Sequence, residues 1–176
     1  GAGLCDSDVC ELARSPYLVN LEELGLGLNQ FGDEGLISVS NSSQMQRLNR
    51  LHLGYNSFSA DGVRALVSSA GLNCVEELSF DSCNLGVRCI EELVKGFGFL
   101  RLVHLNLNSN NIGDAGVVAL SSLKDISFRS IHLRDNIVGE IGVFAIASDE
   151  CFAGLKLLNL QLNQLESSSG WILGQA

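Results

Sequence analysis

Apolar residues recur along the chain at a fixed interval. A nine-residue pattern, LxxLxLxxN with apolar substitutions, begins at residues 21, 48, 75, 102, 128 and 155, so the units are 27, 27, 27, 26 and 27 residues apart. The first copy runs from Leu21 to Asn29, and a cysteine, Cys83, takes the ninth position only in the third copy. Six matches in register do not arise by chance, and the pattern therefore predicts a repeat protein.

Each unit is predicted to hold a short strand followed by a helix. The leucines inside the nine-residue pattern alternate with other residues, which favours a strand, and the apolar pair that follows is spaced by three residues, which favours a helix. These pairs are Leu36 and Val39, Val63 and Leu66, Ile90 and Leu93, Val117 and Leu120, and Val143 and Ile146. The last unit has Gly170 and Leu173 there instead, so its helix is expected to be the weakest.

A single unit of this kind cannot bury both its strand and its helix. Stacking solves the problem because each unit covers the next, and strands joined by helical crossovers must then pair in parallel. Residues 4–14 match the helical half of a unit that lacks its strand, and the chain ends at Ala176 without a polar cap. We therefore expect one array over residues 1–176, with a partial repeat at 1–20 and six repeats after it, belonging to a longer protein.

Two further positions in the unit indicate scaffold. An asparagine at the ninth position lies where the chain leaves the strand, and its side chain can satisfy backbone groups that would otherwise be unpaired. Small residues at Gly35, Gly62, Gly116 and Gly142 come just before the helical pair and permit neighbouring units to approach closely.

Composition narrows the range of partners and compartments. The net charge of −9 argues against binding to phosphates, and hence against a nucleic-acid partner. No apolar run approaches the roughly 20 residues that span a bilayer. The segment that starts at Gly1 has no secretory leader, which predicts a cytoplasmic protein with reduced thiols. The six cysteines lack a CxxC pair or a metal-site spacing, so we expect no metal and no cofactor.

The repeat units resemble the ribonuclease-inhibitor subfamily of leucine-rich repeats. The resemblance rests on LEELGLGLNQFGDEGL, VEELSFDSCNLGVRCIEEL and LVHLNLNSNNIGDAGVVAL, and it covers nearly the whole chain. It implies an α/β fold, a right-handed horseshoe arc with parallel strands on the concave face and helices on the convex face. The subfamily includes cytosolic ribonuclease inhibitors, innate-immune receptors and the GTPase-activating protein of Ran, so the resemblance specifies the fold more closely than the function.

Three rows of side chains are predicted to point out of the concave face. Alternate strand residues face opposite ways, so the third, fifth and seventh positions of each unit share this face. All three histidines of the chain fall in these rows, and the rows contain three acids and two arginines, so the negative charge lies elsewhere. A near-neutral polar strip on an acidic body has the character of a recognition surface.

Six strands give a strip on the order of 25 Å wide, enough for the roughly 800 Å² per partner of a standard interface. The predicted binding residues, with two from the eighth position, are Arg50, His52, Tyr55, Glu77, Ser79, Asp81, His104, Asn106, Asn108, His132, Arg134, Asp135, Asn159 and Gln161. The main hypothesis is a monomeric module that binds another protein through this face.

Several alternatives stay open. The rows can be solvated strand faces with no partner, in a purely structural spacer. A regulator of a small GTPase, similar to the Ran-activating protein, follows from the resemblance alone, because no motif residue supports it. His104 and His132 lie on neighbouring strands and invite a metal or acid–base pair with Asp81 or Asp135. An open strip excludes no water, however, and Cys83 and Ser79 lack an evident base, so we predict no catalysis.

Overall fold

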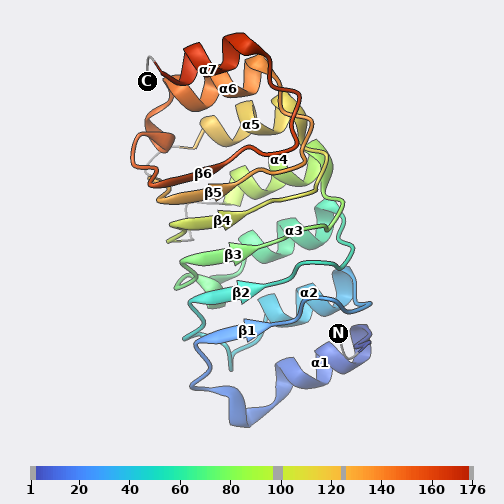
Figure 1. Cartoon of the computed structure of the whole chain (residues 1–176). Coiled ribbons are helices and arrows are strands. Elements are labelled where there is room, and N and C mark those ends of the chain that lie inside the picture. Colours follow the sequence, from blue (N-terminus) through green and yellow to red (C-terminus); the bar gives the residue numbers. More distant parts are fainter. Residues whose placement is uncertain (1–2, 97–100, 124–125, 175–176) are drawn as a thin grey trace.

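The computed structural model describes residues 3–96, 101–123 and 126–174. The described chain alternates strands and helices from end to end (Figure 1). The strands are β1 (Glu23–Gly25), β2 (Arg50–His52), β3 (Glu77–Ser79), β4 (His104–Asn106), β5 (Ser130–His132) and β6 (Leu157–Asn159). The helices are α1 (Asp6–Arg14), α2 (Asp33–Ser40), α3 (Ala60–Val67), α4 (Gly86–Gly96), α5 (Gly113–Ser121), α6 (Glu140–Ser148) and α7 (Ser167–Leu173). Short 3-10 turns lie at η1 (Pro16–Leu18), η2 (Ala70–Leu72) and η4 (Glu150–Phe152).

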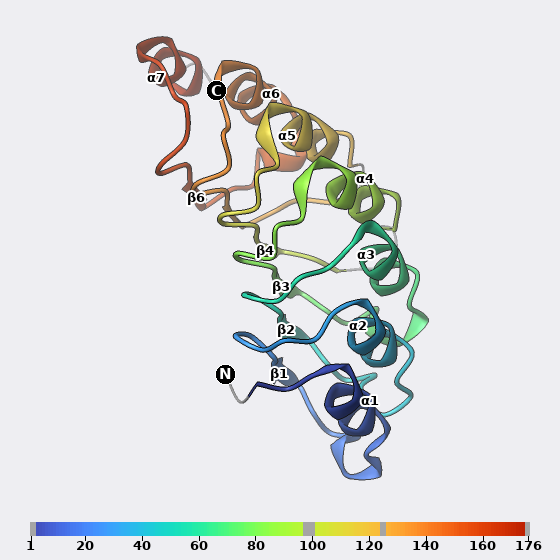
Figure 2. The same ribbon diagram turned by 90° about the vertical axis from the view of Figure 1, so that its right-hand side faces the viewer.

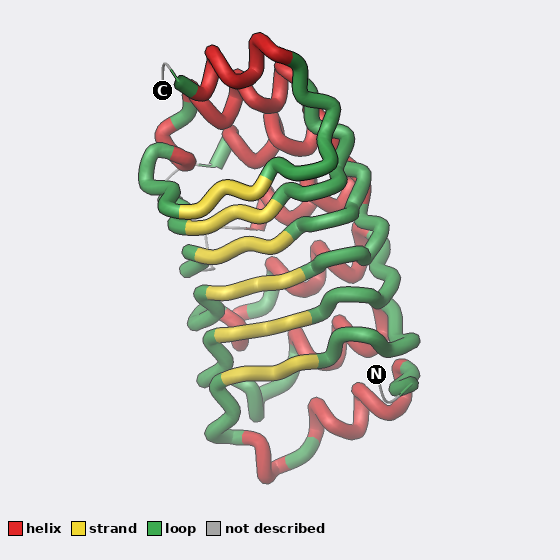
Figure 3. Tube along the Cα trace, viewed as in Figure 1, coloured by secondary structure: helices red, strands yellow, loops and turns green. Residues whose placement is uncertain are grey.

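The strands form one parallel sheet in sequence order, β1-β2-β3-β4-β5-β6. They lie side by side along one face, and the helices lie behind them (Figure 3). Seen from the side, the stack bends into an arc with the sheet on the inner face and the helices on the outer face (Figure 2). This is the predicted solenoid, and the α/β fold class is confirmed.

The core lies between the sheet and the helices, and it is built from the apolar positions of the repeat. The middle residue of each central strand is buried, as Leu51 is in β2 and Leu78 is in β3. The helical pair meets these residues from behind: Val63 of α3 has no exposed surface, and Leu66 has only 2 %. Each apolar position therefore contributes to one continuous core that runs through the stack.

The ninth-position asparagines satisfy backbone groups, as predicted, and the structure shows that they do so across adjacent repeats. Asn110 is fully buried. Its Nδ2 donates to the carbonyls of Phe80 and Leu107, and its Oδ1 accepts from the backbone N–H groups of Cys83 and Leu85. One side chain thus bonds to four backbone groups at the point where the chain leaves the strand. This accounts for asparagine at this position, because buried backbone groups need hydrogen-bond partners.

A second connection between repeats was missed from the sequence. Asp114, in the first turn of α5, accepts hydrogen bonds through Oδ1 from the backbone N–H groups of Gly139 at 2.6 Å and Gly142 at 2.9 Å, at the start of α6. A carboxylate there satisfies open N–H groups and complements the positive end of the helix. Asp6 makes the matching bonds to the start of α2, and Asp33 bonds to Ser59 before α3.

Glycine beside these caps keeps space for the carboxylate. A Cβ atom at Gly142 would lie 2.7 Å from Asp114 Oδ1, and one at Gly62 would lie 2.3 Å from Asp33 Oδ1. The predicted close approach of neighbouring repeats is therefore confirmed at these positions. Glycine is needed there because the carboxylate of the preceding repeat occupies the space of a side chain, which the sequence did not predict.

The six cysteines differ in burial. Cys83, Cys89 and Cys151 are buried, Cys10 is half-buried, Cys5 and Cys74 are exposed, and all six are free thiols. Burial raises the pKa of Cys83 to about 12 and that of Cys89 to about 11, so both thiols stay protonated at neutral pH. Within the part of the chain that the structure describes, no helix is long and apolar enough to cross a membrane.

Candidate protein-binding face

Strand register places the predicted binding residues in rows. One row consists of residues paired in register on successive strands, Arg50, Glu77, His104 and Ser130. The next row consists in the same way of His52, Ser79, Asn106 and His132. The rows exist because each strand has the same length and the same offset within its repeat. A partner crossing the sheet would therefore meet side chains from several repeats at one time.

The N-terminal end of the face is held by an ion pair. Arg50 Nε lies 2.9 Å from Glu23 Oε2, and His52 Nε2 lies 3.6 Å from Glu23 Oε1. Glu23 thus orients two of the predicted residues, although it was not itself among the predicted binding residues. Its place in the same row was the signal that could have included it.

A shallow hollow of about 210 Å³ lies at the middle of the face. All three histidines line it: His52, His104 and His132. His104 Nδ1 lies 2.7 Å from the Ser130 hydroxyl, within hydrogen-bond distance. The structure therefore pairs His104 with the serine directly beside it in the sheet. Glu77, Ser79, Asn106 and Ser130 make up the rest of the polar lining.

Ser79 lies in the predicted row and on the hollow, but only 6 % of it is exposed. Its hydroxyl donates to Asp81 Oδ1 at 2.8 Å, so both side chains are already engaged with each other. The buried Ser79 hydroxyl is therefore not free for a partner, and it holds the Asp81 carboxylate in place on the face.

Three asparagines on the face have their oxygens occupied. Asn106 Oδ1 accepts from the backbone N–H of Asn108, and Asn108 Oδ1 accepts from that of Arg134. Asn159 Oδ1 accepts from the backbone N–H of Gln161 in the same manner. Each oxygen thus keeps a bond within the scaffold, whereas the amide nitrogens, which can only donate, have no hydrogen-bond partner among the described residues.

Tyr55 and Asp135 form the rim at the eighth position. Both have left-handed backbone conformations, with φ of 59° and 57°, where the chain turns out of the strand. Tyr55 is 54 % exposed. Asp135 Oδ2 accepts from the Ser109 hydroxyl at 3.0 Å, which fixes the carboxylate beside the sheet.

The arrangement of metal-binding and nucleophilic side chains bears on whether this face could hold a metal ion or carry a reactive thiol. Among the described residues, no group of three or more His, Cys, Asp or Glu side chains could hold a metal ion. Cys83 lies behind the sheet, where its Sγ donates to the Leu53 carbonyl at 3.3 Å. It is a scaffold residue that replaces the ninth-position asparagine.

Parallel strands, an asparagine at every repeat joint except that of Cys83, and helices on the outer face define a leucine-rich-repeat solenoid. The comparisons agree with this class. A leucine-rich-repeat family model matches residues 17–40, 44–67 and 102–121. The search for curated relatives gave no match.

Among solved structures, the chain is similar to the crystal structure of an internalin from Listeria monocytogenes, with a TM-score of 0.55 and 22% identity. The alignment covers 96% of this chain and 49% of that one, so the chain spans about half the length of the internalin. At this identity the likeness shows the fold alone. The ribonuclease-inhibitor subfamily stays a prediction.

Proposed function

We propose that the protein is an interaction module that binds another protein through its concave strand face. The observation that carries the proposal is the alignment of His52, Asn106, His132 and Asn159 in one row across neighbouring strands. Polar side chains from several repeats then meet a partner together, which favours a broad protein surface over a small ligand.

The groups on offer suggest the character of the partner. Toward the C-terminal end of the face, the asparagine amides have donors that the described scaffold leaves unpaired, and Arg134 adds a guanidinium that only donates. Glu23, Arg50 and Glu77 lie toward the N-terminal end. We therefore expect the partner to present acceptors, either carboxylates or backbone carbonyls, over β4 to β6.

The proposal is tested by removing donors that the scaffold does not use. In His132→Ala/Arg134→Ala, the backbone bonds stay intact and a donor and a positive charge leave the face. The matched control is Arg88→Ala, which removes one positive charge from the outer surface, where the Arg88 side chain is 86% exposed. Immobilised proteins are incubated with native extract, and the retained proteins are compared by mass spectrometry.

We expect a protein that wild type and Arg88→Ala retain equally, and that the double variant retains at least tenfold less, because central donors dominate such interfaces. Equal retention by all three proteins would contradict the proposal. Far-UV circular dichroism checks that the variants are folded. The GTPase alternative stays a separate prediction, tested by measuring GTP hydrolysis across a panel of small GTPases with and without the protein.

A further inference from the structure

An apolar row runs across the outer surface of the last three helices. The seventeenth position of each repeat points away from the core, and it holds Val118 in α5, Phe144 in α6 and Trp171 in α7. These side chains belong to residues that are 44%, 62% and 70% exposed, and Ile141, one turn before Phe144, is 66% exposed. Helix α6 contacts both α5 and α7, so the four side chains lie on one continuous outer surface, which we call the outer patch.

The same positions carry charge in the middle of the molecule. Arg64 of α3 and Glu91 of α4 occupy the seventeenth position there, and Asp61 and Arg88 occupy the place of Ile141. Arg64 pairs with Asp61 at 2.6 Å and with Glu92 at 2.9 Å. The repeat itself therefore does not require apolar residues at these positions.

Helix α6 has the composition of a buried helix, although one of its sides is exposed. Its sequence, EIGVFAIAS, has one charged residue, and Ile141 and Phe144 extend its apolar character to the side that faces away from the core. A helix that is apolar all round is normally covered on all sides. With roughly 150–250 Å² per large side chain, these four residues expose on the order of 400 Å², which is the size of the largest apolar patch on a typical monomer, and such patches are often functional.

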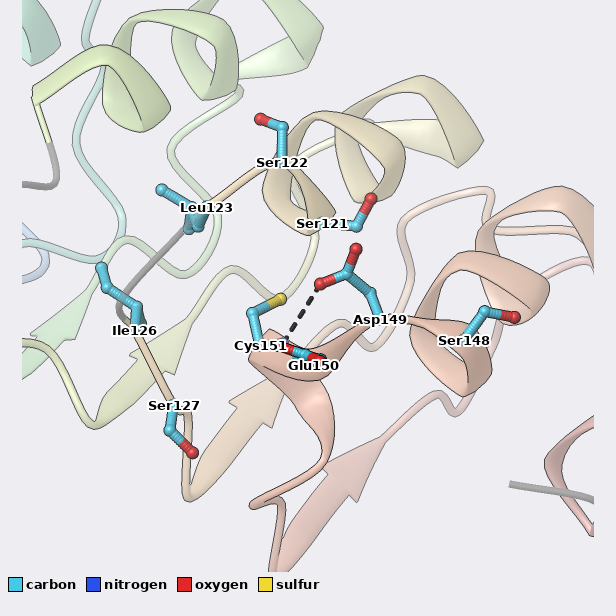
Figure 4. A pocket seen from close by; sticks show the side chains of 9 residues that line it. All are labelled: Ser121, Ser122, Leu123, Ile126, Ser127, Ser148, Asp149, Glu150 and Cys151. Atoms are coloured by element: carbon cyan, nitrogen blue, oxygen red, sulfur yellow. Dashed lines mark hydrogen bonds between the residues drawn. The ribbon is translucent and has the colours of Figure 1, made fainter.

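Acidic residues flank the patch at both ends of α6. Glu140 begins the helix, and Asp149 and Glu150 follow its last turn. The acidic end opens into a hollow of about 820 Å³ between the ends of α5 and α6 (Figure 4). The hollow is lined by Ser121, Ser122, Leu123, Ile126, Ser127, Ser148, Asp149, Glu150 and Cys151.

The electrostatics of that hollow favour a cation. Both helices end at this hollow, and the C-terminus of a helix carries negative partial charge. The two residues between Leu123 and Ile126 lie outside the described residues. Among the described bases, Arg129 and Lys156 are the nearest to the lining residues in the sequence, and they precede β5 and β6 rather than lie on the helices.

We propose that this patch is a second docking surface, which holds an amphipathic helix of a partner with an apolar stripe and lysine or arginine on both sides of it. Helices that pack side by side lie roughly 8–10 Å apart, and seven residues of a helix rise about 10.5 Å. A crossing helix can thus set apolar residues at i, i+7 and i+14 on Val118, Phe144 and Trp171. Its basic side chains then reach Glu140 on one side and the acidic hollow on the other.

The charges favour such a partner over a second copy of this chain. Two copies joined through this patch would bring Glu140, Asp149 and Glu150 against their own counterparts, and like charges at close range oppose association. The inference goes beyond the proposed function because it concerns the outer surface, opposite the concave face, and it stands if that function fails.

Trp171 supplies a specific readout, since it is the single tryptophan of the chain. The probe is a designed amphipathic helical peptide of roughly 20 residues, with leucine at i, i+7 and i+14 and lysine on both flanks. A second peptide has glutamate in place of every lysine. We expect the lysine peptide to shift Trp171 emission to shorter wavelength, to saturate, and to bind at least tenfold more tightly than the glutamate peptide at low salt.

Two variants complete the test. Phe144→Ser should weaken the lysine peptide at least tenfold, and Val118→Ser gives a second reading if that variant folds poorly. His132→Ala/Arg134→Ala should bind the peptide as wild type does, which separates this surface from the concave face. An unchanged emission with the lysine peptide at millimolar concentration would overturn the proposal, and so would equal binding of the glutamate peptide.

Other occupants give distinct results that also overturn it. A second copy would give an emission shift with protein concentration alone and a dimer mass in sedimentation, both lost in Phe144→Ser. A lipid surface would give the shift with phosphatidylcholine vesicles and none with the peptide.

Discussion

The outer surfaces of α3–α4 and α5–α7 differ although both come from the same repeat. At equivalent positions the first has Asp61, Arg64 and Glu91, while the second has Ile141, Phe144 and Trp171. Helices α3 to α6 bury the same apolar pair against the sheet, whereas α7 has the exposed Gly170 and the half-buried Leu173 at these positions. The comparison shows that stacking fixes the inner residues of a repeat and leaves the outer ones free to change. Differences between repeats on the outside therefore carry information about partners, which the repeat pattern itself lacks.

The interior is less uniform than the pattern suggests. Asn136 makes a full set of bonds: its Oδ1 accepts from the N–H groups of Asn110 and Ile112, and its Nδ2 donates to the carbonyls of Leu107 and Arg134. Asn56 donates in the same way, but its buried Oδ1 has no hydrogen-bond partner among the described residues.

The largest expected effect on stability comes from replacing the asparagines, and it tests the difference between Asn136 and Asn56. Asn136→Ala leaves four backbone groups with one partner fewer, and we expect a loss of about 3–4 kcal/mol in the free energy of unfolding. Asn56→Ala removes donors alone, and we expect a loss of about 2 kcal/mol. Urea denaturation followed by circular dichroism measures both. Equal losses would show that the unpaired oxygen of Asn56 has no energetic meaning.

The next effect concerns the cap between α5 and α6. Asp114→Ala removes the acceptor for two N–H groups at the start of α6, and we expect a loss of about 1–2 kcal/mol. The α3–α4 region provides the control, because Ala60 and Val87 stand where Asp114 does and can make no such cap. Hydrogen exchange should show the loss of protection at the start of α6 and an unchanged α4. Uniform loss along the chain would contradict a local cap.

The sequence predicted the fold well because the repeat signals itself six times. Each strand, each helical stripe and the role of residues such as Asn110 follow from positions that stacking constrains. The caps at Asp6 and Asp114 were missed because their bonds cross to the next repeat, and an acid in the first turn of a helix is common in any case. The outer patch was missed for a related reason: Phe144 looks like core until its neighbours are placed.

The candidate site was harder to predict than the fold. Strand alternation placed the rows of the concave face, but alternation does not say which groups are already bonded. Ser79 and Asp81 are joined to each other, and the oxygens of Asn106 and Asn108 are used by the backbone. Glu23 was left out of the predicted binding residues although it orients Arg50. Such contacts depend on side-chain reach between repeats, which a single sequence does not specify.

The smallest expected effect is the response of the two outer surfaces to acid. Hydrogen bonds from Arg64 and Lys95 lower the pKa of Glu92 to about 2, from 4.5. Because the folded pKa is the lower one, Glu92 contributes its full stabilisation above about pH 4.5 and loses it as the pH falls toward 2. Wild type should therefore lose stability relative to Glu92→Gln between these values. The α5–α7 surface has no such ion pairs among its described residues, so Phe144→Ser should show the same pH slope as wild type. Urea denaturation midpoints of the three proteins at pH 7, 4 and 2.5 measure these pH dependences. If Glu92→Gln loses stability with falling pH as steeply as wild type does, the Glu92 ion pairs are not the cause of that loss.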